Sequence, residues 1–138
     1  MAVLIDTSFL LATIFPNDVN HALAREAVKK LHQPHSIIPA PVLQELFYMT
    51  TVRVNYNAAV NYLAQTLNAS FDIQPLVAQD SQRMVSIMRQ YASAAFDYTD
   101  SAIMALSERL KITQVYTFDQ RDFRIFRPQH APFLELLP

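Results

Sequence analysis

The stretch Val3-Leu4-Ile5-Asp6-Thr7-Ser8-Phe9-Leu10-Leu11 indicates the fold class of this chain. Its first three residues are aliphatic, and the acidic and hydroxyl residues that follow mark the end of a short buried strand at Asp6. The apolar run then continues to Phe15 and is closed by Pro16, which predicts a short helix directly after the strand. A buried strand that leads straight into a helix is typical of an α/β protein.

The remainder of the chain continues this alternation of short strands and helices. We expect a helix from a cap at Asn17-Asp18 to about Leu31, a strand at Ser36–Ile38, a helix after Pro41 that includes Val42 to Met49, a helix at Asn57–Leu67, a strand at Phe71–Ile73, a helix capped by Asp80, a helix at Asp97–Leu110 and a strand at Thr113–Phe118. Such an alternation predicts an α/β fold of three layers, in which a short central parallel sheet is flanked by helices. A length of 138 residues, of which 51% are apolar, suits a single domain over residues 1–138.

The sequence contains no glycine and no cysteine. Dinucleotide fingerprints, P-loops and the nucleophile elbow of α/β-hydrolases need glycine, because their backbones adopt positive φ or approach a phosphate closely. The lack of cysteine excludes disulfides, a cysteine nucleophile and thiolate zinc sites. Helix ends must be formed by other residues, such as Asn68 and the eight prolines.

Charge and apolar runs limit the partners of this chain. A formal net charge of -1 provides no overall basic field, so nucleic-acid binding would depend on a local patch or a bound metal. The first residues lack the basic segment and long apolar stretch of a secretion signal, and no later apolar run approaches the roughly 18 residues that span a bilayer. We therefore expect a cytoplasmic protein without a membrane partner.

Four acidic residues are placed where their side chains could meet. Asp6 and Asp119 each lie at the carboxyl end of a predicted buried strand, and ligands bind at this edge of a parallel sheet. Asp100 lies in the first turn of its predicted helix, where the helix dipole favours a negative charge, and Glu45 is similarly placed near a helix start. The four carboxylates could therefore converge on one edge of the sheet.

Each acidic residue also has an ordinary explanation when it is taken alone. Asp6 could cap the helix that follows it, and Asp97 with Asp100 three residues later resembles a capping box. Glu45 could be a solvated helix charge, and Asp119 could serve a polar turn. These alternatives stay open residue by residue, with the capping role favoured for Asp97.

A cluster of carboxylates calls for a cation, since neighbouring negative charges raise one another's pKa and make ionisation of the set costly. Carboxylate oxygens suit Mg²⁺ or Mn²⁺, and neither a cysteine nor an evident histidine pair favours zinc. Such an ion can activate water and neutralise charge on a phosphoryl oxygen, which supports hydrolysis of a phosphodiester. The nearby hydroxyl residues Thr7, Ser8 and Thr117 could orient water or a phosphate, with capping as the alternative, above all for Ser8.

Three segments together resemble the motifs of PIN-domain ribonucleases. Val3–Leu11 looks like the opening motif of these domains, Tyr98–Leu110 like their third motif and Val115–Phe123 like their fourth. The order and spacing of the segments are more specific than any one of them, and the resemblance covers almost the whole chain. The chain departs from the pattern at Lys111, where many members have glycine.

This resemblance implies a PIN-like fold and an endoribonuclease that uses Mg²⁺ or Mn²⁺ to cleave RNA. The implied residues of the catalytic metal site are Asp6, Glu45, Asp100 and Asp119, of which Glu45 rests on a looser match. The secondary candidates are Thr7, Asp97, Thr117 and Asp122. The short form is similar to VapC-type toxins of toxin-antitoxin pairs, which implies a homodimer and a cognate antitoxin protein. The alternative function is a catalytically weak PIN-like scaffold that binds RNA or protein.

Two groups outside the acids have more than one interpretation. Arg121 and Arg124 lie just past Asp119 and could bind RNA phosphates on either side of the cleaved bond, or could be a solvated edge. Four aromatic residues could form a dimer face or an antitoxin groove, although aromatic residues at helical spacing usually belong to a core. These aromatic residues are Phe47, Tyr48, Tyr56 and Tyr62.

Overall fold

A computed structural model of the chain describes residues 1–31 and 35–138. Within these residues the strands are β1 (Val3–Ile5), β2 (Ser36–Pro39), β3 (Asp72–Gln74), β4 (Gln114–Tyr116) and β5 (Glu135–Leu137). The helices are α1 (Thr7–Ile14), α2 (His21–Val28), α3 (Ala40–Arg53), α4 (Tyr56–Asn68), α5 (Ala78–Gln90), α6 (Tyr98–Arg109) and α7 (Arg121–Ile125). The strands form one sheet in the order β3-β2-β1-β4-β5, and every neighbouring pair is parallel.

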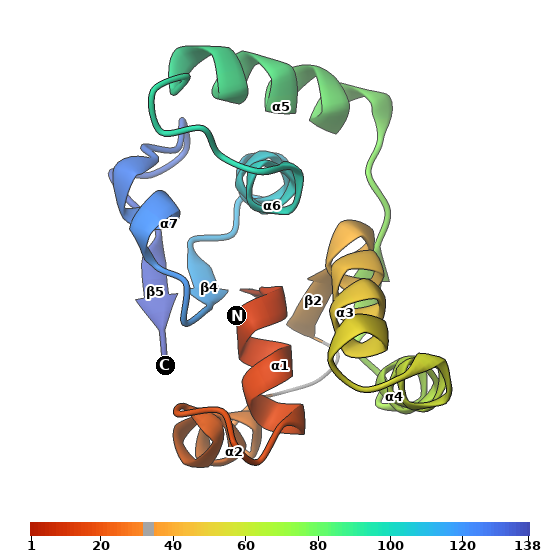
Figure 1. The fold of residues 1–138 in the computed structure, drawn as a ribbon. Helices are drawn as coiled ribbons and strands as arrows, with labels where there is room; N and C mark the ends of the chain where they lie inside the picture. The colour runs from red at the N-terminus through yellow and green to blue at the C-terminus, as the bar shows by residue number, and fades with distance from the viewer. Residues whose placement is uncertain (32–34) are drawn as a thin grey trace.

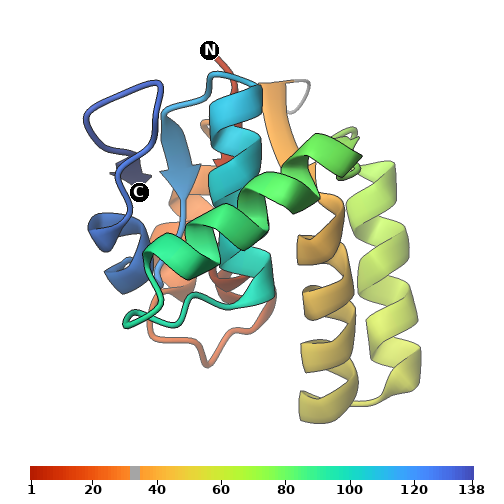
Figure 2. The same cartoon turned by 90° about the horizontal axis from the view of Figure 1, so that it is seen from above.

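Helices lie on both faces of this sheet, as Figure 1 shows. α5 and α6 lie on one side of the strands, whereas α1 and α2 lie on the other. α3 and α4 pack against each other as a helical hairpin that projects from one side of the body (Figure 2). The expected α/β fold with a central parallel sheet is therefore confirmed. In the described residues, no helix combines the length and the apolar character needed to cross a bilayer.

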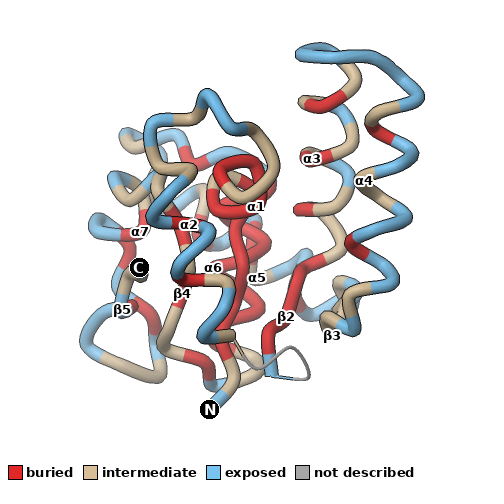
Figure 3. Tube along the Cα trace, turned by 90° about the horizontal axis from the view of Figure 1, so that it is seen from below, coloured by how far each residue is buried: buried red, intermediate tan, exposed pale blue. Residues whose placement is uncertain are grey.

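β1 and α6 are deeply buried (Figure 3). β1 is the central strand of the sheet, and each of its residues is buried. In α6 every residue from Thr99 to Glu108 is buried, so this helix contacts other elements around its whole circumference. Ser101, Ala102 and Ala105 are small enough to let the neighbouring elements approach α6 closely. The amino end of α6 is thus held firmly beside the sheet.

Two helix starts differ from the sequence-based expectation. α2 begins at His21 and not at the expected cap, because the carboxylate of Asp18 instead accepts a hydrogen bond from the backbone N–H of Asn20 at 2.8 Å. Asp80 lies inside the first turn of α5 rather than at its cap, where its carboxylate accepts a hydrogen bond from the backbone N–H of Val77 at 2.9 Å. Both acids accept hydrogen bonds from backbone N–H groups near a helix start, but neither occupies the cap position that we expected.

No pattern in the sequence predicts α7 or β5. The five residues of α7 are too few for a helical period to be recognised. β5 has the sequence Glu-Leu-Leu, which includes an acid and no β-branched residue and so gives no strand signal. β5 forms because β4 offers it a parallel partner: Val115 pairs with Leu136, and the backbone N–H of Glu135 donates to the carbonyl of Thr113 at 2.7 Å. The last strand is therefore a consequence of the sheet and not of local propensity.

In the described part of this glycine-free chain, three residues have a left-handed backbone. They are Ser70, Ala95 and Lys111, with φ values of 63°, 54° and 58°. Asn68, which we expected to end a helix in this way, is instead the last residue of α4. The left-handed backbone disfavours residues with a Cβ atom, so each of these three positions carries a small conformational cost.

Lys111 ends α6 with the hydrogen bonds that a left-handed residue makes there. Its backbone N–H donates to the carbonyl of Glu108 at 3.3 Å, and the N–H of Ile112 donates to the carbonyl of Ser107 at 2.9 Å. This pair of bonds is a Schellman motif, in which glycine is the usual residue. The lysine thus adopts the conformation that glycine would favour at the same position.

Candidate active site

Asp6 lies at the point where β1 runs into α1. Its backbone N–H donates to the carbonyl of Tyr116 in β4 at 3.0 Å, which continues the pairing of the two central strands. Its side chain is 3% exposed and makes no capping bond to α1. Instead, one carboxylate oxygen accepts hydrogen bonds from the hydroxyls of Thr117 at 2.7 Å and Ser8 at 3.0 Å. The capping interpretation of Asp6 is therefore wrong.

Two hydroxyl groups connect the ends of β1 and β4. The Ser8 hydroxyl lies 3.1 Å from that of Thr117 and accepts a hydrogen bond from the backbone N–H of Phe118 at 2.9 Å. The Thr117 hydroxyl accepts one from the backbone N–H of Asp119 at 3.0 Å. These bonds hold the Asp119 backbone beside Asp6. Ser8, for which capping was the open alternative, is a member of this network.

Asp97 and Asp100 lie at the amino end of α6. The Asp97 carboxylate accepts a hydrogen bond from the backbone N–H of Asp100 at 2.8 Å, so the capping role expected for Asp97 is confirmed. Asp100 is 6% exposed, although it lies in the first turn of its helix. The buried position of α6 thus directs the Asp100 side chain toward the end of the sheet and away from solvent.

A cleft of about 610 Å³ brings the predicted acids together. All four primary candidates line it, together with the secondary candidates Thr7 and Asp97. Its lining consists of Asp6, Thr7, Ser8, Leu11, Asn17, Asp18, Val19, Asn20, Glu45, Met49, Arg53, Asp97, Asp100, Phe118 and Asp119. One concave surface is therefore formed by segments that are far apart in sequence, from α1, α3, α6 and the end of β4.

Several residues of this cleft escaped the sequence analysis. Asn17, Asp18 and Asn20 belong to the polar turn after α1, which we interpreted as the cap of the next helix. Arg53 is a cation in the lining, held over the ring of Phe15 with its guanidinium carbon 5.8 Å from the ring centroid. The polar composition of this turn was a sequence signal that could have identified Asn17, Asp18 and Asn20 as site residues. Arg53 gave no such signal, because basic residues are common in the last turn of a helix.

The remaining candidates lie beside the cleft rather than in its lining. Thr117 is fully buried behind Asp6, and Asp122 is half-buried with one carboxylate oxygen 3.7 Å from Arg121. The Arg121 side chain is 74% exposed, and that of Arg124 donates a hydrogen bond to the Gln120 amide oxygen at 2.7 Å. Neither arginine lines the acidic cleft. Their role in RNA binding therefore stays a prediction.

Burial shifts the ionisation of the two innermost acids. Burial raises the pKa of Asp6 from 3.8 to about 6, and the charge of Glu45 acts in the same direction, although the hydroxyls of Thr117 and Ser8 oppose the shift. Burial also raises the pKa of Asp100 to about 9, with further contributions from the charges of Asp6 and Asp97. A hydrogen bond with the Asp122 carboxyl and the charge of Asp119 add to this shift. The pair therefore resists carrying two negative charges.

The residue types of the cleft fit a divalent cation. Carboxylates alone supply the charged oxygens, which suits a hard ion such as Mg²⁺ or Mn²⁺, and a cation would relieve the repulsion that raises the two pKa values. In the described residues, however, no three acidic or histidine side chains are yet gathered closely enough to hold one ion. Binding of a cation would thus require the carboxylates to draw closer together.

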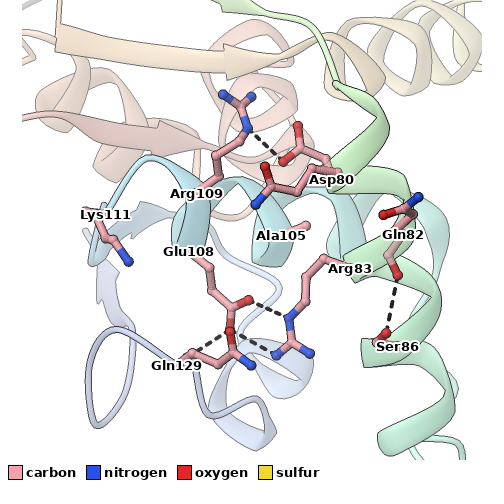
Figure 4. Close-up of a pocket in the computed structure, with 10 residues that line it drawn as sticks. Asp80, Gln82, Arg83, Ser86, Ala105, Glu108, Arg109, Lys111 and Gln129 are labelled. Atoms are coloured by element: carbon pink, nitrogen blue, oxygen red, sulfur yellow. Dashed lines mark hydrogen bonds and ion pairs between the residues drawn. The ribbon is translucent and has the colours of Figure 1, made fainter.

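A second cleft, of about 420 Å³, lies between α5 and α6 (Figure 4). The Arg83 guanidinium binds both carboxylate oxygens of Glu108, at 2.6 and 3.1 Å, and Arg109 binds Asp80 at 2.8 Å. Burial acts to raise the pKa of Glu108, but the bonds from Arg83 and the backbone N–H of Gln129 outweigh it and leave the pKa lowered. Because each acid here is paired with an arginine, this cleft joins two helices and has no free carboxylate for catalysis.

Comparison with known families identifies the fold. A family model described as the PIN domain matches residues 3–127. The chain belongs to the PIN domain family. The matched range of this PIN domain includes Asp6, Glu45, Asp100 and Asp119, so the acids that share the cleft all lie within it.

Individual relatives agree with this assignment. This PIN domain is 25% identical over 127 residues to the protein named Ribonuclease VapC26 of Mycobacterium tuberculosis, with 91% of this chain and 93% of that protein covered. It superimposes on the crystal structure of Mycobacterium tuberculosis VapC20, described as a Sarcin-Ricin loop cleaving toxin, with a TM-score of 0.80, 20% identity and coverage of 87% and 92%. A toxin-antitoxin complex from Klebsiella pneumoniae gives a TM-score of 0.64 at 17% identity, with coverage of 88% and 90%. The structural matches bear out the fold.

Proposed function

We propose that this PIN domain is a divalent-metal-dependent endoribonuclease that hydrolyses RNA phosphodiester bonds. The observation that carries the proposal is the meeting of Asp6, Glu45, Asp100 and Asp119 in one cleft of a PIN domain. The relative named Ribonuclease VapC26, aligned over 91% of this chain, supports a ribonuclease activity. The cleft is open to solvent at the end of the sheet, where a strand of RNA can reach it.

In this proposal the candidate acids and the hydroxyl residues beside them have defined tasks. Asp6, Asp100, Asp119 and Glu45 would hold Mg²⁺ or Mn²⁺, which would supply activation of water and neutralisation of charge on the phosphoryl oxygen. Thr117 and Ser8 orient the Asp6 carboxylate by hydrogen bonds of 2.7 and 3.0 Å. Thr7, whose buried hydroxyl has no hydrogen-bond partner among the described residues, is a candidate to bind water or a phosphate oxygen.

We further propose that the chain is the toxin of a VapBC-type pair and is silenced by a cognate antitoxin protein. Support comes from its likeness to a structure titled as a toxin-antitoxin complex, and from its likeness to VapC20, which is described as a toxin. A cytoplasmic location belongs to the same proposal, because a toxin that cleaves cellular RNA must reach it there. The homodimer implied by the resemblance to VapC-type toxins is likewise part of the proposal.

Cleavage of defined RNAs in Mg²⁺, Mn²⁺ and EDTA tests the activity. We expect cleavage by the parent protein with either ion, no cleavage in EDTA, and a loss of at least about a hundredfold in kcat for Asp6→Asn and Asp100→Asn. An Asp72→Asn variant serves as the control, because this acid lies in β3 and does not line the cleft. Equal rates for the parent, the site variants and the EDTA sample would instead favour the scaffold alternative.

A further inference from the structure

We infer that a side pocket between α3 and α6 is a binding site for an unpaired nucleobase next to the cleaved bond. This inference rests on the proposed ribonuclease function and specifies its substrate class. The pocket has a volume of about 330 Å³, which lies near the small end of the range of ligand sites. It is lined by Pro41, Gln44, Glu45 and Tyr48 of α3 and by Tyr98 and Thr99 of α6.

The side pocket is continuous with the acidic cleft. Glu45 lines both of them. Thr99 lines the pocket, and the next residue, Asp100, lines the cleft. A nucleotide whose phosphate lies among the carboxylates would therefore have this pocket beside it. The position suits the base of a nucleotide that flanks the cleaved phosphodiester.

Two tyrosines at this pocket are exposed, and within the described residues neither forms an aromatic pair or a cation-π contact. The exposed fractions of Tyr48 and Tyr98 are 67% and 58%. By contrast, Phe47 packs edge-on against Tyr56 at a centroid distance of 5.9 Å. Exposed rings of this kind are platforms on which bases stack, at a gain of roughly tenfold or more in affinity per base.

The charge of the lining favours a base over a phosphate. Glu45 is the charged residue of the pocket and lies where the pocket joins the acidic cleft, whereas the other lining residues are neutral. A phosphate in the pocket would be repelled by Glu45 and would find no cation there. The exposed amide of Gln44 offers both a donor and an acceptor to the edge of a base.

Occupation of this pocket requires a base that is not held in a helix. Bases of an RNA duplex are stacked and paired, and only those of single strands, loops and bulges can be turned outward onto an aromatic ring. The structure thus assigns a preference for single-stranded or looped RNA. The side pocket with its two tyrosines, and not the acidic cleft, decides this preference.

Abasic substitution in the RNA, combined with loss of the tyrosine rings, tests the inference. An RNA that the parent cleaves is remade with an abasic residue on either side of the cleaved bond. For one of the two positions we expect the parent to lose about tenfold in kcat/KM, mainly through KM. The double variant Tyr48→Ala, Tyr98→Ala should lose about the same factor on the intact RNA and nothing further on the abasic RNA.

Two sets of variants control for indirect effects. Tyr48→Phe and Tyr98→Phe keep the ring, so these variants should discriminate between the intact and the abasic RNA as the parent does. Tyr56→Ala removes an exposed tyrosine of α4 that does not line the pocket, and it should also behave as the parent. The inference is overturned if the double variant retains the full abasic penalty, or if the parent shows no penalty at either position.

Binding to a non-cleaving variant separates this inference from the proposed function. In an Asp100→Asn background, anisotropy of a labelled single-stranded oligonucleotide should show about tenfold weaker binding after loss of both rings, and a duplex of the same sequence should bind weakly throughout. If the parent cleaves no RNA but this ring dependence is present, the proposed function fails and the base site stands. If loss of the rings changes the sedimenting mass and leaves RNA binding unaltered, the pocket is a contact between copies of the chain and the base site falls.

Discussion

At Asp100, burial and the charges of Asp6 and Asp97 raise the pKa to about 9, and burial raises the pKa of Asp6 to about 6. Both values exceed the ordinary value of 3.8, so the folded chain binds more protons than the unfolded chain over this range. The stability that the protonated forms contribute is fully present below that ordinary value. It is lost as the pH rises through the folded values of about 6 and about 9.

We predict that the free energy of unfolding of the metal-free protein falls between about pH 6 and about pH 9. Urea unfolding in EDTA at a series of pH values measures this change. Addition of Mg²⁺ or Mn²⁺ at the alkaline end should restore stability, because a cation favours the charged carboxylates. A profile that stays flat or rises over this interval would contradict the pKa shifts.

Substitution of Asp100 identifies the origin of this pH dependence. Asp100→Asn keeps the shape of the side chain and imitates its protonated form, so it should flatten the profile and raise the melting temperature in EDTA at about pH 8 by roughly 3 °C. Asp119→Asn is the matched control, because this carboxyl is exposed and should shift the melting temperature by less. The acid that we assign to catalysis would then be one that destabilises the metal-free fold.

At the scale of the elements, the end of α6 shows how the chain manages without glycine. Lys111 has a φ of 58°, and the Schellman bonds around it satisfy the last carbonyls of the helix. We predict that Lys111→Gly increases the free energy of unfolding by about 0.5 kcal/mol, since relief of the Cβ strain outweighs the added freedom of the unfolded chain. Chemical denaturation of the two proteins measures the difference.

A neighbouring position of α6 provides the control for this substitution. Arg109→Gly places a glycine within the helix and removes the ion pair with Asp80, so it should destabilise the protein. A loss of stability in Lys111→Gly itself would show that the lysine side chain contributes more than the strain it imposes.

The pairing of α5 with α6 makes a different prediction. The Arg83–Glu108 pair is largely buried, with side-chain exposures of 22% and 8%. Arg83→Met should lower the free energy of unfolding by roughly 2 kcal/mol, because Glu108 is left with a poorly compensated charge. Lys29→Met, which breaks the exposed pair with Glu26, should change the free energy of unfolding far less, because solvent screens that pair. Equal effects in the two variants would mean that burial of the first pair has no energetic consequence.

The whole molecule is expected to unfold as one domain and to associate as a homodimer. We predict a single thermal transition whose midpoint rises with protein concentration, because association stabilises the folded state by mass action. Calorimetry over a hundredfold range of concentration, with sedimentation equilibrium at each end, measures both properties. Two separated transitions would divide residues 1–138 into more than one domain, and a monomer with a constant midpoint would exclude the dimer.

Local patterns predicted individual elements well where those elements are long or strongly apolar. β1, α6 and the acids at their ends were recognised because a strand that ends in an acid, and a capped helix, leave a signal in consecutive residues. α7 left none because it is short, and β5 left none because it depends on the edge that β4 presents. For Ser8 the sequence left capping open as an alternative, because its hydroxyl bonds to residues more than a hundred positions away and these leave no local signal.

The amino-acid sequence by itself determined the alternation of strands and helices, the absence of glycine-dependent nucleotide sites and the identity of the candidate acids, since each depends on residues that are adjacent in the chain. Only the tertiary structure decided that Asp6 is held by Thr117, that Glu45 lines both the cleft and a side pocket, and that Arg53 lines the same cleft as the acids. Burial and the distances between remote side chains follow from packing, and the pKa of Asp100 follows from burial and distance.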